Sequence, residues 1–96
     1  MDINKCILSY SSIISWGIIE KEVFIFNEET KKMYILRDYL ADFWMSISFQ
    51  KSVSEVIQDL KSTYKITPSI ENRIQHSIMK CVEDKLLVVN GNDCNE

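Results

Sequence analysis

The chain has 96 residues, of which 46% are hydrophobic and 26% are charged, and its formal net charge at pH 7 is −3. This length favours one compact domain, and this composition is typical of a folded globular protein rather than a disordered one. The mild acidity argues against a dedicated nucleic-acid-binding protein, because such proteins usually carry a basic excess.

The N-terminal part of the chain predicts an antiparallel β-sheet. The secondary-structure signal of the first residues is weak: Cys6–Leu8 is predicted as a short strand or packed arm, and the serine-rich stretch Ser9–Ser12 as a turn. Three runs rich in β-branched and aromatic residues follow at short spacing, which favours a meander because parallel strands need long crossover connections. These predicted strands are Ile13–Ile19, Val23–Phe26 and Lys32–Arg37.

After the third strand the hydrophobic period changes from two residues to 3.6, which predicts three helices. Asp38 is the predicted N-cap of the first helix, because its carboxylate can accept free amide protons of the first turn. Ser52 opens the second helix with Glu55 three residues on, a capping-box pattern. The third begins near Thr67, with Pro68 at its first position, where the missing N–H costs nothing. The positions expected to be apolar and buried are Leu40, Phe43, Trp44, Ile47, Val53, Val56, Ile57, Leu60, Tyr64, Ile70, Ile74, Ile78, Cys81 and Val82.

The order of these elements predicts an α+β fold, in which an N-terminal three-stranded antiparallel β-sheet is followed by a three-helix winged helix-turn-helix bundle. We expect residues 1–89 to form the single domain, with Leu86–Val89 as a short extension or strand, and residues 90–96 to form a flexible polar tail. No apolar stretch approaches the roughly 20 residues of a membrane-spanning helix, and the start of the chain lacks a signal-peptide pattern. We therefore expect a cytoplasmic protein with no membrane association.

Residue types that carry catalysis or metal binding are sparse. The single histidine, His76, is predicted on the polar side of the third helix, and the two glycines do not make a phosphate-binding loop. The three cysteines show no CxxC spacing, and no cluster of Asp, Glu and His has metal-ligand spacing. We therefore predict that the protein is not an enzyme and has no catalytic residues, no metal site, no cofactor and no structural disulfide.

Two surfaces remain as candidate binding sites. One is the third strand, because an outer strand with unpaired N–H and C=O groups can accept a peptide as an added strand. Its apolar residues alternate, with Met33 and Ile35 on one face, and the pattern leaves open whether both faces are core. The other is a flank of the third helix, where Gln75 and Met79 border the apolar stripe and Asn72 lies further round. A methionine there lines an adaptable groove or fills a gap in the core.

One set of residues, in a fixed order across positions 22–89, is moderately specific as the signature of a protein family. It comprises the acidic turn Phe26–Lys31, Met33–Leu36, Ala41, Phe43–Trp44, Ser52–Val56, Leu60, Tyr64, the stripe Ile70, Ile74, Ile78 and Val82, and Leu86–Leu87. This set resembles the PqqD-like family, the RiPP recognition elements that bind leader peptides of ribosomally made, modified peptides. The chain departs from the family pattern at Arg37, where Asn is frequent, and at Lys85, where Gly is frequent.

The resemblance implies a non-catalytic peptide chaperone. Its leader peptide would add as a strand beside the third strand and lie against the third helix, and the module would deliver the precursor to a separate peptidase, cyclase or radical-SAM enzyme acting in trans. Arg37 and Lys31–Lys32 would attract acidic leader residues. The peptide-binding residues that the resemblance implies are Met33, Tyr34, Ile35, Leu36, Arg37, Asn72, Arg73, Gln75 and Met79.

Two other functions stay open. A small winged-helix DNA-binding regulator would use Arg73, His76 and Lys80 on the polar side of the third helix, although acidic residues nearby would repel phosphates. A structural adaptor would dock a partner protein through the same sheet edge, which would also permit a strand-to-strand homodimer. On balance we expect a peptide partner and no nucleic acid.

Overall fold

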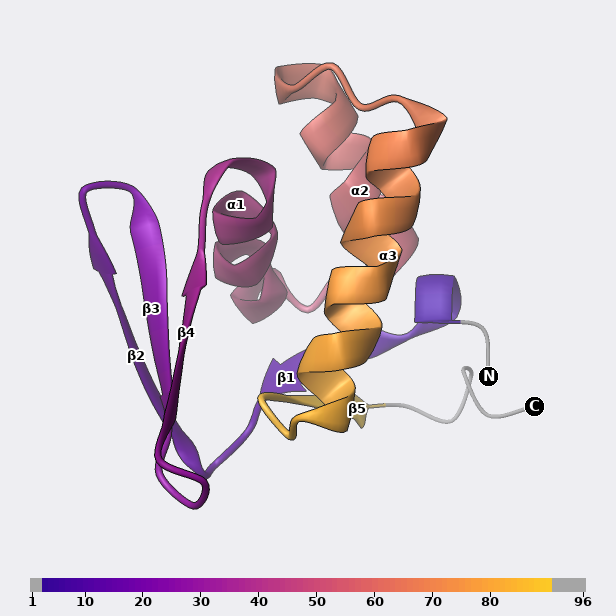
Figure 1. The fold of residues 1–96 in the computed structure, drawn as a ribbon. Helices are drawn as coiled ribbons and strands as arrows, with labels where there is room; N and C mark the ends of the chain where they lie inside the picture. The colour runs from indigo at the N-terminus through magenta and orange to yellow at the C-terminus, as the bar shows by residue number, and fades with distance from the viewer. Residues whose placement is uncertain (1–2, 91–96) are drawn as a thin grey trace.

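The computed structural model describes residues 3–90 and has the predicted α+β class (Figure 1). An antiparallel sheet and three helices form most of the domain, and a second, smaller sheet joins the two ends of the described chain. No helix in this part of the chain is long and apolar enough to cross a membrane. The elements in order are η1 Ile3–Lys5, β1 Ile7–Tyr10, β2 Ile14–Ile19, β3 Glu22–Asn27, β4 Lys32–Leu36, α1 Asp38–Ser46, η2 Ile47–Phe49, α2 Val53–Thr63, α3 Pro68–Glu83 and β5 Leu87–Asn90.

The larger sheet is the predicted meander, with strand order β2-β3-β4 and every strand within one residue of its predicted bounds. The β2–β3 hairpin has a two-residue loop, because Ile19 pairs with Glu22. Both loop residues, Glu20 and Lys21, have positive φ angles of 50° and 69°. That conformation matches the right-handed twist of the strands, and it usually selects Asn or Gly rather than longer side chains.

The smaller sheet pairs β1 with β5 antiparallel, with Ile7 opposite Asn90 and Tyr10 opposite Leu87. The short strands expected near both ends are therefore present, but two predicted boundaries are wrong. Ser9 lies inside β1 rather than in a turn, and Asn90, which we assigned to the polar tail, is the last residue of β5. The rest of the predicted tail, residues 91–96, lies outside the described residues.

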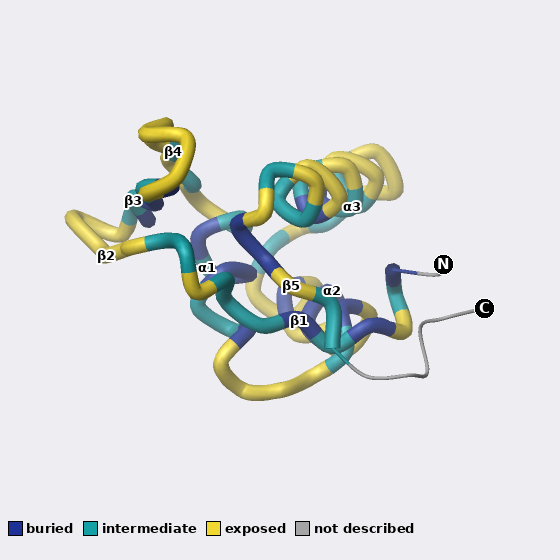
Figure 2. Tube along the Cα trace, turned by 90° about the horizontal axis from the view of Figure 1, so that it is seen from below, coloured by how far each residue is buried: buried dark blue, intermediate teal, exposed yellow. Residues whose placement is uncertain are grey.

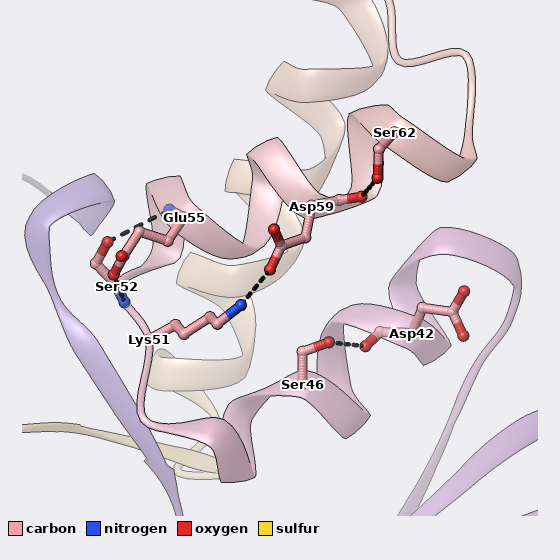
Figure 3. A network of polar contacts seen from close by, with 7 residues as sticks. All are labelled: Asp42, Ser46, Lys51, Ser52, Glu55, Asp59 and Ser62. Atoms are coloured by element: carbon pink, nitrogen blue, oxygen red, sulfur yellow. Dashed lines mark hydrogen bonds and ion pairs between the residues drawn. The ribbon is translucent and has the colours of Figure 1, made fainter.

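The helix starts confirm two predictions and correct one. The capping box of α2 is present, since the Glu55 N–H donates to Ser52 Oγ at 3.3 Å and the Ser52 N–H donates to Glu55 Oε1 at 2.9 Å (Figure 3). Helix α3 begins as predicted, with Pro68 as its first residue, and Thr67 is its N-cap. Asp38, however, is not the N-cap of α1: the extended Arg37 holds that position without a side-chain cap, and Asp38 is the first residue of α1, with a positive φ of 54°. The chain passes from β4 into α1 without a loop, so Asp38 makes the bend itself.

The core lies where the three helices meet the inner face of β3 and the smaller sheet (Figure 2). The apolar stripes predicted for the helices supply most of it, and the inward residues of β3, Val23 and Ile25, are fully buried. Leu40, Ile70, Cys81 and Val82 are only partly buried and pack at the edge of this core. An aromatic cluster of Tyr10, Trp16 and Trp44 closes one side, with the Tyr10 hydroxyl donating to the Trp44 carbonyl at 2.6 Å.

Candidate functional site

Strand β4 is an outer strand of the larger sheet. It pairs with β3 on one side, in a register that places Tyr34 opposite Ile25 and Leu36 opposite Val23, and within residues 3–90 no strand pairs with its other side. A strand edge of this kind presents main-chain donors and acceptors to any extended segment that approaches it. The edge predicted from the sequence is therefore present in the fold.

The two faces of β4 differ in exposure, which answers the question that the sequence left open. Tyr34 and Leu36 are half-buried and pack on the core, whereas Met33 and Ile35 are 58% and 44% exposed. The alternative that both faces of the strand are core is therefore wrong. The inward-facing residues of β4, Tyr34 and Leu36, line the same pocket as residues of α3. Strand β4 and α3 lie on the same side of α1 (Figure 2).

An open groove of about 450 Å³ lies between β4 and α3. Its walls come from the strand on one side and from one flank of the helix on the other, and its lining is mainly apolar. An apolar cleft with a few polar groups beside a free strand edge suits an extended peptide. The lining residues are Tyr34, Ile35, Leu36, His76, Ser77, Lys80, Cys81, Asp84 and Leu86.

The apolar part of the groove includes Leu36, Cys81 and Leu86, of which Leu86 is buried and the other two are half-buried. Burial raises the pKa of the Cys81 thiol to about 11, and the negative charge of Asp84 adds to the shift. The thiol is therefore protonated at neutral pH and behaves as a small apolar group rather than a nucleophile.

The polar part of the groove is organised around Asp84, the C-cap residue of α3. The Lys80 Nζ lies 3.7 Å from Asp84 Oδ1, one helical turn away. Desolvation raises the pKa of the Tyr34 hydroxyl, and the Asp84 carboxylate raises it further. This end of the groove thus carries paired charges and a neutral phenol, which are groups that fix a main chain or a polar side chain by hydrogen bonding.

The residues predicted on β4 divide between the groove and its surroundings. Tyr34, Ile35 and Leu36 line the groove, and Met33, which shares the exposed face of the strand with Ile35, does not. Arg37 follows the strand as the N-cap of α1 and forms an ion pair with Glu22.

The residues predicted on the third helix lie mostly on the wrong flank for this groove. Gln75 donates through Nε2 to Asn4 Oδ1 at 3.0 Å, so it faces the η1 side of the helix. Met79 follows Gln75 one turn later and Asn72 precedes it by nearly one turn, so both share that flank. Arg73 precedes the groove residue Ser77 by one turn and lies on the groove flank.

The residues that sequence reasoning missed are Ser77, Cys81, Asp84 and Leu86 as groove lining, together with His76 and Lys80, which were considered only for DNA. The apolar stripe of α3 shows which side is buried, but it has two borders and nothing local indicates which border meets β4. The sequence holds one weak signal for the flank that faces the groove. Ser77 and Cys81 are small residues at positions i and i+4, and small side chains leave room beside a helix.

The predicted DNA face also looks onto the groove. His76 and Lys80 line it, and Arg73 lies one turn before Ser77 on the same flank. The nearby Asp84 carboxylate pairs with Lys80 and reduces the positive charge there. The winged helix-turn-helix arrangement itself stays a prediction.

No family model and no curated protein matches this chain. Among solved structures, it is similar to TbiB1 in complex with the TbiA(beta) leader peptide, with a TM-score of 0.75 and 16% sequence identity. The similarity covers 88% of this chain and 99% of the TbiB1 chain. At this level of identity, the likeness establishes a shared fold.

Proposed function

We propose that this protein is a non-catalytic module that binds the leader segment of a ribosomally made precursor peptide. The observation that carries the proposal is the free edge of β4 beside an apolar groove whose other wall is α3. It is supported by the solved structure of the same fold, which is a complex with a leader peptide. The PqqD-like residue set noted in the sequence is consistent with the same role.

In this proposal the leader adds as a strand to the outer edge of β4, and its main chain supplies most of the affinity. Side chains of a strand alternate between two faces, so every second leader residue would point into the groove. An apolar leader side chain would cover Leu36 and Cys81, and Lys80 and Arg73 would favour an acidic residue beside it. The module would then present the precursor to a separate modifying enzyme.

The direct test is an NMR titration of the labelled protein with N-terminal segments of the precursor peptides encoded beside its gene. Amide shifts concentrated on residues 32–37 and on Ser77, Lys80 and Cys81 are expected, with small shifts at Met79. Duplex DNA is titrated in parallel at low salt, because DNA binding is strongest there. Shifts with DNA and none with any peptide would replace the proposal with the DNA-binding regulator.

A matched pair of substitutions tests the location of the groove. Ser77→Phe places a ring in the groove, and Met79→Phe places the same ring on the opposite flank of the same helix. We expect Ser77→Phe to weaken peptide binding at least about tenfold, a loss typical of a blocked central contact. Met79→Phe should stay within about twofold of the wild type. Equal effects of the two variants, in folded protein by circular dichroism, would place the peptide elsewhere.

A further inference from the structure

Asn27 is the one polar or charged side chain that is fully buried within residues 3–90, with an exposed fraction of 0%. It is the last residue of β3 and lies on the inner face of the sheet, in line with Val23 and Ile25. Burying an amide without hydrogen-bond partners is costly. The hydrogen bonds of the Asn27 side chain therefore explain why a polar residue can occupy this buried position.

The Asn27 side chain makes three hydrogen bonds. Its Oδ1 accepts from the backbone N–H of Glu29 at 2.9 Å and of Thr30 at 3.0 Å, which shapes the turn between β3 and β4. Its Nδ2 donates to the backbone carbonyl of Asp84 at 3.2 Å, 57 residues away. Carbonyl groups at the C-terminal end of a helix lack partners within the helix, so this bond satisfies one of them.

This last bond ties together the two walls of the groove at one end. Asn27 pairs with Lys32, the first residue of β4, and Asp84 is the C-cap of α3 and lines the groove. Asp84 also raises the pKa of the Tyr34 hydroxyl, and this contact lies at the same end of the groove. At the other end of β4, Arg37 pairs with Glu22 of β3 rather than with the helix. Of these contacts at the two ends of β4, only the one at the Asn27 end reaches α3.

We propose that Asn27 is a positioning residue that sets the width of the groove and thereby the affinity for peptide. The inference rests on the proposed function, because the groove width matters only if an extended chain enters. An added strand lies about 4.8 Å from its neighbour, and it must still contact α3 on its other side. If the separation of β4 and α3 increases, the peptide can pair with the strand or pack on the helix, but it cannot make both contacts at once with good geometry.

Asn27→Asp isolates the bond to α3. The new carboxylate still accepts from Glu29 and Thr30, so the turn is retained, but it has no proton to donate to the Asp84 carbonyl. We expect peptide binding at least tenfold weaker than in the wild type, measured by calorimetry at pH 8. Alkylation of Cys81 in the free protein, followed by mass spectrometry, should be several-fold faster because the groove is wider.

Low pH should rescue this variant. A protonated carboxyl group regains a donor for the Asp84 carbonyl. Burial and the nearby Glu29, Glu83 and Asp84 raise the pKa of this carboxyl group, against the opposing effects of Lys32, Lys85 and the two N–H donors. The ratio of variant to wild-type affinity should therefore rise as the pH falls from 8 to 5. The wild-type protein corrects for titration of the other groups around position 27, which are Glu29, Lys32, Tyr34, Glu83, Asp84 and Lys85.

Two further variants separate positioning from stability. Asn27→Ser keeps a short acceptor for the turn but does not reach Asp84, so it should lose affinity without the pH rescue. Ser52→Ala removes the α2 cap on another part of the domain and should lower stability while leaving peptide affinity unchanged.

The outcomes are distinct. If the wild type binds no peptide in the titration described above, the proposed function fails and the role of Asn27 in binding fails with it. If the wild type binds and folded Asn27→Asp binds equally well with unchanged Cys81 alkylation, only the positioning role is overturned. Unfolding of both Asn27 variants would assign the residue to fold stability and would also overturn that role.

Discussion

At the residue scale, several side chains act in ways that differ from what their chemistry suggests in isolation. Cys81 is a thiol in a candidate binding groove, yet burial and the Asp84 charge keep it protonated. Tyr64 shows a similar effect: its hydroxyl donates to the Asp42 carboxylate, and this bond, followed by desolvation, raises its pKa to about 12. Neither group is prepared for acid–base chemistry near neutral pH. Both instead serve the packing of α1, α2 and α3.

The Cys81 pKa gives a prediction for its reactivity. With a pKa of about 11 against an ordinary value of 9.0, the reactive thiolate is about a hundredfold scarcer at pH 8 than in an exposed cysteine. The rate of iodoacetamide modification should rise about tenfold per pH unit from pH 8 to 10, followed by mass spectrometry at Cys81. In urea-unfolded protein the rise should level off near pH 9. A folded-state profile that also levels near pH 9 would contradict the assigned burial.

The raised pKa of Cys81 also makes the free energy of unfolding depend on pH. The folded state holds the Cys81 proton more tightly than the unfolded state, because its pKa is raised. The stabilisation associated with this group is therefore fully present below pH 9 and is lost as the pH rises toward 11.

At the scale of elements, the β2–β3 hairpin and the start of α1 show where backbone geometry overrides residue preference. Glu20 and Lys21 take positive φ in a two-residue loop, and Asp38 takes φ 54° as α1 begins. Non-glycine residues adopt this region at a cost. The surrounding strand pairing and helix packing impose it, so these positions are sites where local preference and tertiary structure conflict.

Replacing the hairpin loop with the pair that its geometry favours should stabilise the protein. Glu20→Asn combined with Lys21→Gly relieves two strained positions in a turn that prefers Asn-Gly. We expect the free energy of unfolding in urea to increase by about 1 kcal/mol. The matched control is Lys31→Gly with its φ of 64°, which should give a smaller gain because it relieves one position. A loss of stability from the double substitution would mean that the loop side chains make contacts that outweigh the strain.

At the scale of the whole molecule, the domain is held together by pairings between distant parts of the chain. β1 and β5 bring the two ends of the described chain into one sheet (Figure 1). The Asn27–Asp84 bond joins the larger sheet to the end of α3. The groove lies beside the second attachment, with one wall from β4 and the other from α3. The candidate binding surface is therefore a property of how the parts are joined rather than of any one element.

A ligand that spans both walls should stabilise the entire domain. Binding to the folded state alone adds about 2.7 kcal/mol when the peptide concentration is 100 times Kd. For a domain of this size, that corresponds to a rise in Tm of roughly 10 °C or more. Differential scanning calorimetry with leader peptide measures it, and a scrambled peptide is the control. Binding without a rise in Tm would indicate that the peptide contacts a flexible segment instead of the groove.

Much of the fold follows from local patterns in the sequence. The change of period after the third strand located the helices, Ser52 with Glu55 and Thr67 with Pro68 marked two helix starts, and alternation along β4 separated its exposed face from its packed face. These features depend on residues a few positions apart, so a single sequence contains them. The pairing of β1 with β5 does not follow from local patterns, because it joins segments about 80 residues apart.

The candidate site shows the same division. The sequence alone determined that apolar residues alternate between the two faces of the third strand and that the third helix has an apolar stripe. Only the tertiary structure decided that β4 meets the Ser77 and Lys80 flank of α3 rather than the Gln75 and Met79 flank. The physical reason is that helix periodicity defines which side is buried, whereas the rotation of that helix relative to a sheet results from packing across the whole core, including the bond from Asn27 to Asp84.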